Sequence, residues 1–420
     1  MATIEIRNLG PIKEAKFDLN KVNVFMGPQS SGKSTIAKII SYCTWLDKKY
    51  ARDGSLGVIK NGDVNVPAYI EELKTYHRLT NGYFSDKTKI VFDGEEIVFS
   101  YPAEKTSGMM SLEDDSKCKV SFKTAKRRQS SKVIYIPSER NFVSSIYNLN
   151  EYLRDRDLIQ DFVNNWYEAK RKYSKDHRLQ ILDLGVQYYN EGEDIDRLLL
   201  DGGEELTLQI ASSGLQAIVP LITLLDYVAR GIYNEARPMS VSERDKMIKQ
   251  YNDMISKLQE DGTKTNRDNL DILFDLIVSK NYNYSQFIIE EPEQNLFPTT
   301  QRDLVYYMLR LINDPNRNHR LTFTTHSPYI LYALNNCMMG GLVNSQFVAG
   351  DEKEKFLKNG FLSEKSWINP QLVSVWEIED GKIRNIQDKD NIISENYFDK
   401  KMTELTDEYY QILNYYKDEE

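Results

Sequence analysis

Residues 27–35 decide the fold of this chain, and they run Gly27-Pro28-Gln29-Ser30-Ser31-Gly32-Lys33-Ser34-Thr35. The stretch matches the phosphate-binding pattern G-x-x-x-x-G-K-[ST] at every fixed position. An apolar run over residues 21–26 predicts a buried strand before it, and residues 36–40 predict a helix after it. This context argues against an ordinary Gly/Ser-rich turn. The glycines let successive backbone N–H groups face phosphates, so we expect Lys33 to reach the β- and γ-phosphates and Ser34 to bind Mg²⁺.

Two carboxylates end a second apolar run. Residues 286–289 predict another buried strand, and Glu290 and Glu291 follow it directly. Beside a phosphate loop, acids at a strand end are typical of a magnesium ligand and a general base. We therefore expect Glu290 to hold Mg²⁺, directly or through water, and Glu291 to polarise an attacking water. Glu290 is one methylene longer than the aspartate usual at such a position, and the alternative is a solvated acidic strand end.

His326 follows residues 321–325, a β-branched run that predicts the next core strand. At the end of that strand its imidazole can contact a γ-phosphate and hold the carboxylate of Glu291. A lone histidine is more often structural, and the sequence Thr-Thr-His-Ser-Pro shortly after Glu291 is what favours a catalytic role here. The remaining histidines have no comparable setting and are expected to be structural; they are His77, His177 and His319.

Ser212, Ser213 and Gly214 precede an apolar segment, residues 217–228, that predicts a helix. Serine and glycine are common at helix N-termini, so an ordinary capped helix is a serious alternative to a phosphate-binding role.

The order of these motifs resembles ABC-type ATPases of the SMC and OLD-like branch. The resemblance covers about residues 2–385, and it is carried by residues 4–12, 27–35, 135–140, 211–216, 290–298 and 325–328. It implies an α/β fold, an ABC-type P-loop ATPase head with β-rich and helical insertions and no long coiled coil. It also implies hydrolysis of ATP to ADP and phosphate by a dimer closed head to tail. Ser212, Ser213 and Gly214 of one subunit would then bind the γ-phosphate held by the other.

Within that branch the chain is similar to the stand-alone ATPase subunits of the bacterial anti-phage systems PARIS and Septu. This similarity implies a homodimer, or a higher oligomer of dimers, that controls a separate effector protein such as a nuclease or a toxin. The alternative is a DNA-repair or maintenance ATPase that acts on DNA directly, as RecF and SMC relatives do. A transporter ATPase is a third alternative. The resemblance also implies a dimer-contacting loop at Asn295 and Leu296, whereas no Q-loop glutamine is identified.

Length and motif spacing indicate one discontinuous ATPase domain over residues 1–385, because the phosphate loop and the paired acids must meet. We expect a mixed strand and helix insertion at 46–131, a helical lobe containing Ser212 to Gly214 at 143–285, and an amphipathic helix at 386–420. A short apolar stripe at Met247, Tyr251, Met254 and Leu258 is too brief for a coiled-coil arm. The 94 residues after His326 leave no room for a TOPRIM nuclease sheet around Asp388 and Asp390.

Composition narrows the partners. The net charge of −9 argues against a general nucleic-acid binder, so DNA contact would need a local patch. The three cysteines show no C-x-x-C spacing, which indicates neither a zinc hook nor a disulfide framework. We find no apolar run of about 18 residues, so we expect a cytoplasmic protein without a membrane span.

Two basic clusters are candidate DNA contacts. The first lies within ten residues and contains Lys123, Lys126, Arg127, Arg128 and Lys132. The second interleaves cations with aromatic residues and contains Trp166, Tyr167, Lys170, Arg171, Lys172, Tyr173, Lys175 and Arg178. The alternative for both is a solvated charged face over core aromatics.

The C-terminal segment carries an apolar stripe with alternating spacings of four and three: Phe398, Met402, Leu405, Tyr409, Ile412 and Tyr416. Such spacing predicts a helix with one apolar face. We expect this face first to pack against the ATPase lobe, and alternatively to dock another subunit.

Overall fold

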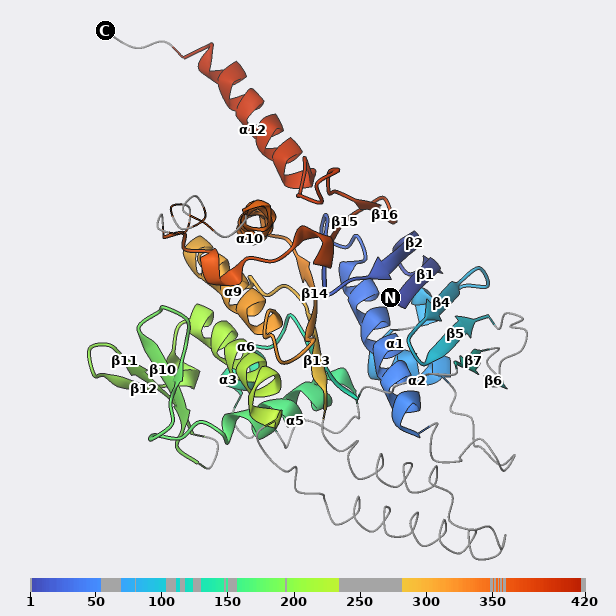
Figure 1. The fold of residues 1–420 in the computed structure, drawn as a ribbon, viewed down its shortest axis with the longest axis horizontal. Helices are drawn as coiled ribbons and strands as arrows, with labels where there is room; N and C mark the ends of the chain where they lie inside the picture. The colour runs from blue at the N-terminus through green and yellow to red at the C-terminus, as the bar shows by residue number, and fades with distance from the viewer. Residues whose placement is uncertain are drawn as a thin grey trace, which may run out of the picture.

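The protein was analysed as a computed structural model that describes residues 2–53, 69–79, 81–102, 111–113, 118–123, 130–146, 149, 157–192, 195–233, 282–347, 350, 353, 355, 357 and 360–416. Within these ranges a 12-stranded sheet crosses the molecule (Figure 1) in the order β6-β7-β5-β4-β1-β2-β16-β15-β3-β14-β13-β8. The apolar stripe predicted at residues 247–258 and the cations Lys126, Arg127 and Arg128 lie outside the described residues.

One half of the sheet is parallel and holds the segments on which the site depends. Its strands are β3 (Val22–Met26), β8 (Ser131–Ile136), β13 (Tyr284–Ile289), β14 (Arg320–Thr325) and β15 (Val373–Glu379). All five residues of β3 are buried, as expected for a parallel strand covered on both faces. Because Met26 pairs with Thr325 and Phe323 with Ile289, the carboxyl ends of β3, β14 and β13 lie at one edge. In open α/β sheets this edge is where ligands bind.

The other half is largely antiparallel and absorbs the expected insertion. Its strands are β1 (Ala2–Leu9), β2 (Ile12–Leu19), β4 (Lys89–Asp93), β5 (Ile97–Tyr101), β6 (Ser111–Glu113), β7 (Lys119–Phe122) and β16 (Lys382–Asn385). The hairpin predicted at Asp93-Gly94 is present, since β4 and β5 pair antiparallel. β4 also pairs with β1, so the strands of the 46–131 insertion extend the main sheet.

Helices cover both faces of the sheet and divide the core in two. One core lies under α1 (Lys33–Asp53) and α2 (Tyr69–Tyr76), where Ile36, Leu73 and Phe92 are buried. The other lies under α5 (Leu158–Lys170), α6 (Ser213–Ala229), α9 (Pro298–Ile312) and α10 (Pro328–Gln346). A small helix, α3 (Phe142–Ser145), and a second sheet flank α6 (Figure 1); the sheet contains β9 (Leu179–Gln180), β10 (Val186–Asn190), β11 (Asp196–Leu200) and β12 (Glu205–Thr207).

One described helical stretch is long and apolar enough to cross a membrane, although no such run was identified from the sequence. It comprises α6 with the following turn, Ser213–Tyr233, and 67% of its most apolar window is buried inside the protein. Buried residues such as Ile218, Leu221 and Leu225 pack into the core that also contains Phe287 of β13.

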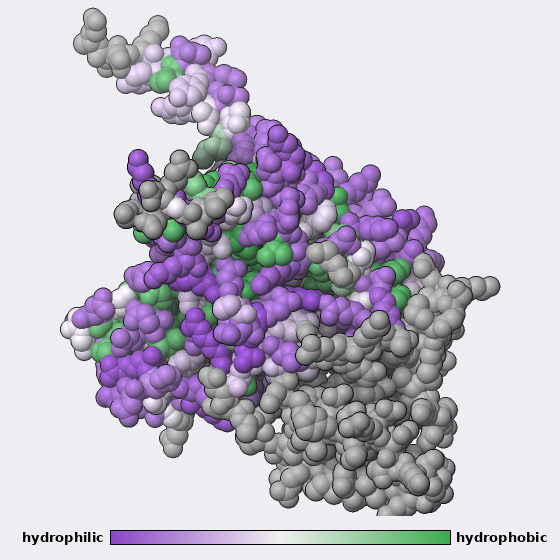
Figure 2. Space-filling view, viewed as in Figure 1, coloured by the Kyte–Doolittle hydropathy of each residue, from purple (hydrophilic) through white to green (hydrophobic). Residues whose placement is uncertain are grey.

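The C-terminal helix α12 (Tyr397–Leu413) projects away from the body (Figure 1). None of its residues is buried, and Met402, Leu405, Tyr409 and Ile412 are between 62% and 66% exposed. Phe398, the first residue of the stripe, packs against the core of the body, and the expectation that the stripe packs against its own lobe is wrong for the residues after it. Figure 2 shows the same helix set off from a body whose visible face is mainly hydrophilic.

Candidate functional site

The phosphate loop connects β3 to α1 and requires glycine at two positions. Gly27 and Gly32 adopt φ values of 150° and 107°. A Cβ on Gly27 would overlap the carbonyl of Ile378, and one on Gly32 would overlap the side chain of Ile12. Glycine therefore fits both for backbone conformation and for close approach. α1 begins at Lys33, so the loop delivers its N–H groups and a helix N-terminus to the same place.

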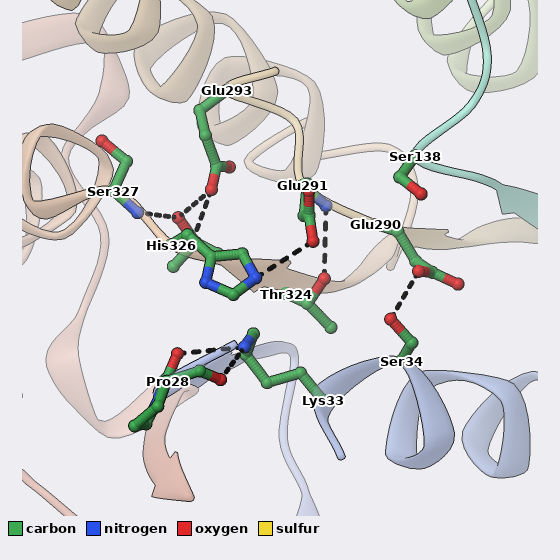
Figure 3. Close-up of polar contacts among 12 residues, drawn as sticks. Pro28, Lys33, Ser34, Ser138, Glu290, Glu291, Glu293, Thr324, His326 and Ser327 are labelled. Carbon is green, nitrogen blue, oxygen red and sulfur yellow. Dashed lines mark hydrogen bonds and ion pairs between the residues drawn. The ribbon is translucent and has the colours of Figure 1, made fainter. Parts of the chain in front are cut away.

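Lys33 folds back over the loop that carries it. Its Nζ donates to the carbonyls of Gly27, at 2.9 Å, and Pro28, at 2.7 Å (Figure 3). Burial lowers the pKa of Lys33 to about 8, although the nearby carboxylates of Glu291 and Glu293 favour the charged form. The ammonium group thus lies at the loop, where it can exchange two carbonyl contacts for phosphate oxygens.

The loop hydroxyl and the first acid are in direct contact. Ser34 Oγ donates to Oε2 of Glu290 at 2.6 Å, and Glu290 is buried. Burial raises the pKa of Glu290, and the hydrogen bond from Ser34 opposes that shift. Hydroxyl and carboxylate oxygens are ligands that Mg²⁺ prefers, together with substrate phosphates and water. Ser34 and Glu290 therefore fit the magnesium ion that a P-loop nucleotide site uses.

Glu291 and His326 form the second pair at this edge of the sheet. Nε2 of His326 lies 3.0 Å from Oε1 of Glu291 (Figure 3). This hydrogen bond is the largest cause that holds the pKa of Glu291 below its usual range; burial opposes it. Glu291 has a left-handed backbone, with φ 42°, and its N–H donates to the carbonyl and the hydroxyl of Thr324.

Glu293 is a site residue that the sequence reasoning did not single out. Its Oε1 accepts hydrogen bonds from the Thr325 hydroxyl, at 2.9 Å, and from the backbone N–H of His326 (Figure 3). Burial raises the pKa of Glu293. Glu293 lies two residues after Glu291, in the segment 290–298. That short spacing is the signal in the sequence that could have placed it in the site.

A cleft of about 610 Å³ joins these groups. Its lining combines the proposed catalytic groups with Tyr83 and with residues of the phosphate loop and the first hairpin: Lys33, Ser34, Glu291, His326, Gln29, Ser30, Thr35, Gly10 and Pro11. The volume is in the usual range for small-molecule sites, about 300–1,000 Å³. No Q-loop glutamine follows β8. Instead, Ser138 lies in that loop, close to Glu290 in Figure 3.

Ser212, Ser213 and Gly214 do not line this cleft. They form the start of α6, where Ser212 Oγ accepts from the N–H of Leu215 at 3.4 Å and both serines are exposed. A Cβ on Gly214 would lie 3.0 Å from the carbonyl oxygen of Asn295, so the two predicted dimer-contacting segments touch. The N-cap interpretation is correct locally, and the exposed serines leave the surface of this helix start open.

The second basic cluster is only partly the surface that its composition indicates, since Arg171, Lys175 and Arg178 are exposed but other members are not. Lys170 is buried and lies 3.5 Å from the buried carboxylate of Asp196. Trp166 and Tyr173 are buried as well, so neither can stack on a base, and this part of the DNA expectation is wrong. In the first cluster, Lys123 contacts Asp93 and the carbonyl of Gly94.

The other histidines have structural surroundings. His77 is fully buried, and burial lowers its pKa to about 3. Nδ1 of His319 accepts from the N–H of Ser285 at 3.0 Å, and burial lowers the pKa of His319 to about 4. His177 stacks on Tyr173.

Comparison with known proteins gives distant structural similarities. No curated protein matches the sequence significantly. Similar solved structures include the SMC head domain from Thermotoga maritima (TM-score 0.36, 10% identity, 94% of this chain and 98% of that one). Another is the Smc head domain from Pyrococcus furiosus bound to the C-terminal domain of ScpA (0.35, 11%, 97% and 99%). A third is a nucleotide-free ATP-binding cassette from an ABC transporter (0.32, 9%, 93% and 93%).

Residues 1–180 match the family model of the AAA ATPase domain. This segment holds the phosphate loop, the antiparallel strands β1, β2 and β4 to β7, and two strands of the parallel half, β3 and β8. The α/β fold predicted from the sequence is confirmed, and none of the described helices is long enough for a coiled-coil arm. The chain has the fold of a P-loop ATPase.

Proposed function

We propose that this protein is a magnesium-dependent ATPase that works as a dimeric molecular switch. One observation carries the proposal. The ends of three strands far apart in the sequence bring Lys33, Ser34 and the Glu291–His326 pair into the lining of a single cleft, and Glu290 is hydrogen-bonded to Ser34 beside it. Lys33 suits binding of the phosphates, the Ser34–Glu290 pair suits binding of the metal, and the Glu291–His326 pair suits activation of the water, which are three requirements of phosphoryl transfer.

The proposed roles in ATP hydrolysis follow from the position and charge of each side chain. Lys33 moves from the Gly27 and Pro28 carbonyls to the β- and γ-phosphates of ATP. Ser34 and Glu290 would hold Mg²⁺, and the bound ion would supply positive charge beside the phosphates. Glu291, whose pKa is lowered, is ionised at neutral pH and accepts a hydrogen bond from the attacking water. His326 holds the Glu291 carboxylate in place, and Glu293 holds the backbone of His326.

The placement of Ser212, Ser213 and Gly214 supports a head-to-tail dimer. The two serines are exposed, and none of the three lines the cleft of its own protomer. A helix N-terminus with exposed serine hydroxyls suits a phosphate from a second molecule. Closure on ATP therefore places Ser213 of one protomer against the γ-phosphate bound by Lys33 of the other, and hydrolysis reopens the pair.

The switch acts in the cytoplasm on a separate effector protein in bacterial anti-phage defence. The motif resemblance supports this role, and α12 supplies an exposed apolar face through which an effector can dock. The alternative is direct action on DNA; burial of Trp166 and Tyr173 removes the aromatic side chains that could stack on bases, and only exposed cations such as Arg171 and Arg178 are left to contact phosphates.

A pair of variants tests the proposal. Glu291→Gln keeps the size of the side chain and removes its charge, so it should bind ATP, remain dimeric by native mass spectrometry and lose at least about 100-fold in turnover. Ser213→Arg should bind ATP as a monomer, because the change lies outside the cleft. Full turnover by Glu291→Gln, or ATP-dependent dimers of Ser213→Arg, would contradict these roles.

The effector role needs its own experiment. Glu291→Gln co-expressed with its native gene neighbours and purified in ATP should carry a stoichiometric protein with its own nuclease or toxin domain. The matched sample is Lys33→Ala, which should not bind ATP and should not form the closed dimer. Nucleic acid alone on the Glu291→Gln dimer would instead support DNA maintenance.

A further inference from the structure

Arg140 has a side chain that the proposed reaction does not use directly. It is fully buried, and its guanidinium donates to five backbone carbonyls. Nε donates to Ala217 at 3.3 Å and Nη1 to Pro137 at 3.4 Å; Nη1 also donates to Glu290 at 3.0 Å, and Nη2 donates to Glu291 at 2.9 Å and Pro292 at 3.0 Å. Burying a charge is costly unless it is well hydrogen-bonded, so this arrangement fixes several segments relative to one another.

The first of these segments carries the proposed general base. Glu291 is held in a left-handed backbone conformation that residues other than glycine rarely adopt. Its N–H is bound by Thr324 on one side and its carbonyl by Arg140 on the other. Backbone strain of this kind persists only where the surroundings enforce it, and it concentrates at functional sites. Arg140 and Thr324 therefore together aim the Glu291 carboxylate at His326 and the cleft.

The second segment is the start of α6, which carries Ser213. Ala217, one turn after Ser213, accepts the Nε bond of Arg140. The preceding carbonyl, that of Gln216, accepts from the hydroxyl of Ser144 at 2.9 Å. Gly214 approaches the carbonyl of Asn295 so closely that a Cβ would lie 3.0 Å away. The proposed phosphate-binding end of α6 and the turn 290–295 are thus joined through Arg140 and by direct contact.

We infer that Arg140 is a positioning residue that couples the two nucleotide sites of the dimer. Engagement of Ser213 with the partner's γ-phosphate is transmitted through α6 and Arg140 to Glu291 of the same protomer. Each protomer then hydrolyses its own ATP efficiently only while the start of its α6 contacts the ATP that is bound by the partner. This inference rests on the proposed dimeric ATPase and adds to it a route for cooperativity between the sites.

The test is Arg140→Lys, which keeps the charge but has three donors in place of five and lacks the planar fork. We expect ATP affinity to stay within about twofold, because the phosphate loop is untouched, and kcat to fall by about tenfold or more. We expect the Hill coefficient of ATP hydrolysis to exceed one in the wild type and to fall to about one in the variant.

Two controls separate positioning from loss of packing. Ile218→Val removes one methyl from the buried face of α6 beside Ala217, and Arg302→Lys makes the same chemical change at a half-exposed arginine of α9. Both should keep the Hill coefficient and most of kcat. Ile218→Val should also have a lower melting temperature. It therefore shows how much weaker packing of α6 by itself changes kcat and the Hill coefficient.

The outcomes are distinguishable. Unchanged kcat and cooperativity in Arg140→Lys would overturn the inference, as would an equal loss of cooperativity in Ile218→Val. If Arg140→Lys does not fold, Ser144→Ala removes the neighbouring tie to Gln216, and it should lower the Hill coefficient at unchanged ATP affinity; no change would again overturn the coupling. A wild type that binds no ATP would instead remove the proposed function.

Discussion

The hydroxyl of Ser34 lies 2.6 Å from the carboxylate of Glu290, although 256 positions separate the two residues in the chain. We expect Glu290→Gln to keep an acceptor for Ser34 but to lose the charge that attracts Mg²⁺. Mg²⁺ affinity in the presence of ATP should fall by about tenfold or more, whereas ATP affinity in a metal chelator should not change. Metal titration of ATPase activity measures the first quantity, and equal Mg²⁺ affinity in variant and wild type would exclude Glu290 as a ligand.

His326 should set the acid limb of the pH–rate profile. The His326 hydrogen bond is the largest cause of the lowered pKa of Glu291, and Glu291 acts as a base only above that pKa. His326→Ala therefore raises the pKa, so activity should begin to fall at a higher pH, together with a loss of about 10- to 100-fold in kcat at neutral pH. His326→Gln retains a donor and should shift the limb less. An acid limb that stays in place in His326→Ala would contradict this assignment.

ATP binding should take up protons at alkaline pH. Burial lowers the pKa of Lys33 to about 8, and bound phosphates favour its ammonium form. Below that pH Lys33 is already charged, so the affinity for ATP should not change with pH. As pH rises through about 8 the free protein loses the proton, and affinity should weaken by up to about tenfold per pH unit. Calorimetry in two buffers at about pH 9 should show proton uptake on binding, and none would argue against Lys33 as the titrating group.

Lys170 should matter for stability rather than for DNA. Its removal leaves Asp196 buried without its cationic partner, so Lys170→Met should lower the free energy of unfolding by about 3–5 kcal/mol. The exposed Lys175 provides the control. Lys175→Ala should change the free energy of unfolding by less than about 0.5 kcal/mol. The double variant Lys170→Met with Asp196→Asn should recover part of the loss, because no uncompensated charge remains. Urea unfolding measures the free energy of unfolding of all three variants. An unchanged value in Lys170→Met would show that the Lys170–Asp196 pair contributes little to stability.

Removal of residues 401–420 should leave the ATPase body intact. The cut spares the N-terminal cap, in which Asn396 and Asp399 bind each other's backbone N–H groups, and every described side chain that it removes, through Tyr416, is exposed. The melting temperature should shift by less than about 2 °C and basal turnover should persist. A drop of several degrees would mean that α12 packs on the body in solution.

The sequence alone predicted which residues gather at the candidate site, and it predicted the class of fold, which is confirmed. Residues 27–35 carry their own local signal, because glycine, lysine and serine at fixed spacing serve one loop geometry. Glu290, Glu291 and His326 each end an apolar run, and the ends of parallel strands meet at one edge. Local pattern was therefore enough to predict which residues gather.

Only the tertiary structure decided which side of each element faces the core and which distant groups touch. Arg140 reaches carbonyls 77 and 151 positions away, and nothing in the segment around it specifies those partners. Lys170 and Trp166 form a cluster that resembles a nucleic-acid surface in sequence, yet packing of α5 against α6 buries them. The apolar stripe of α12 has the spacing of a packed helix and is nevertheless exposed. Periodicity specifies an apolar face, but long-range packing decides what covers it.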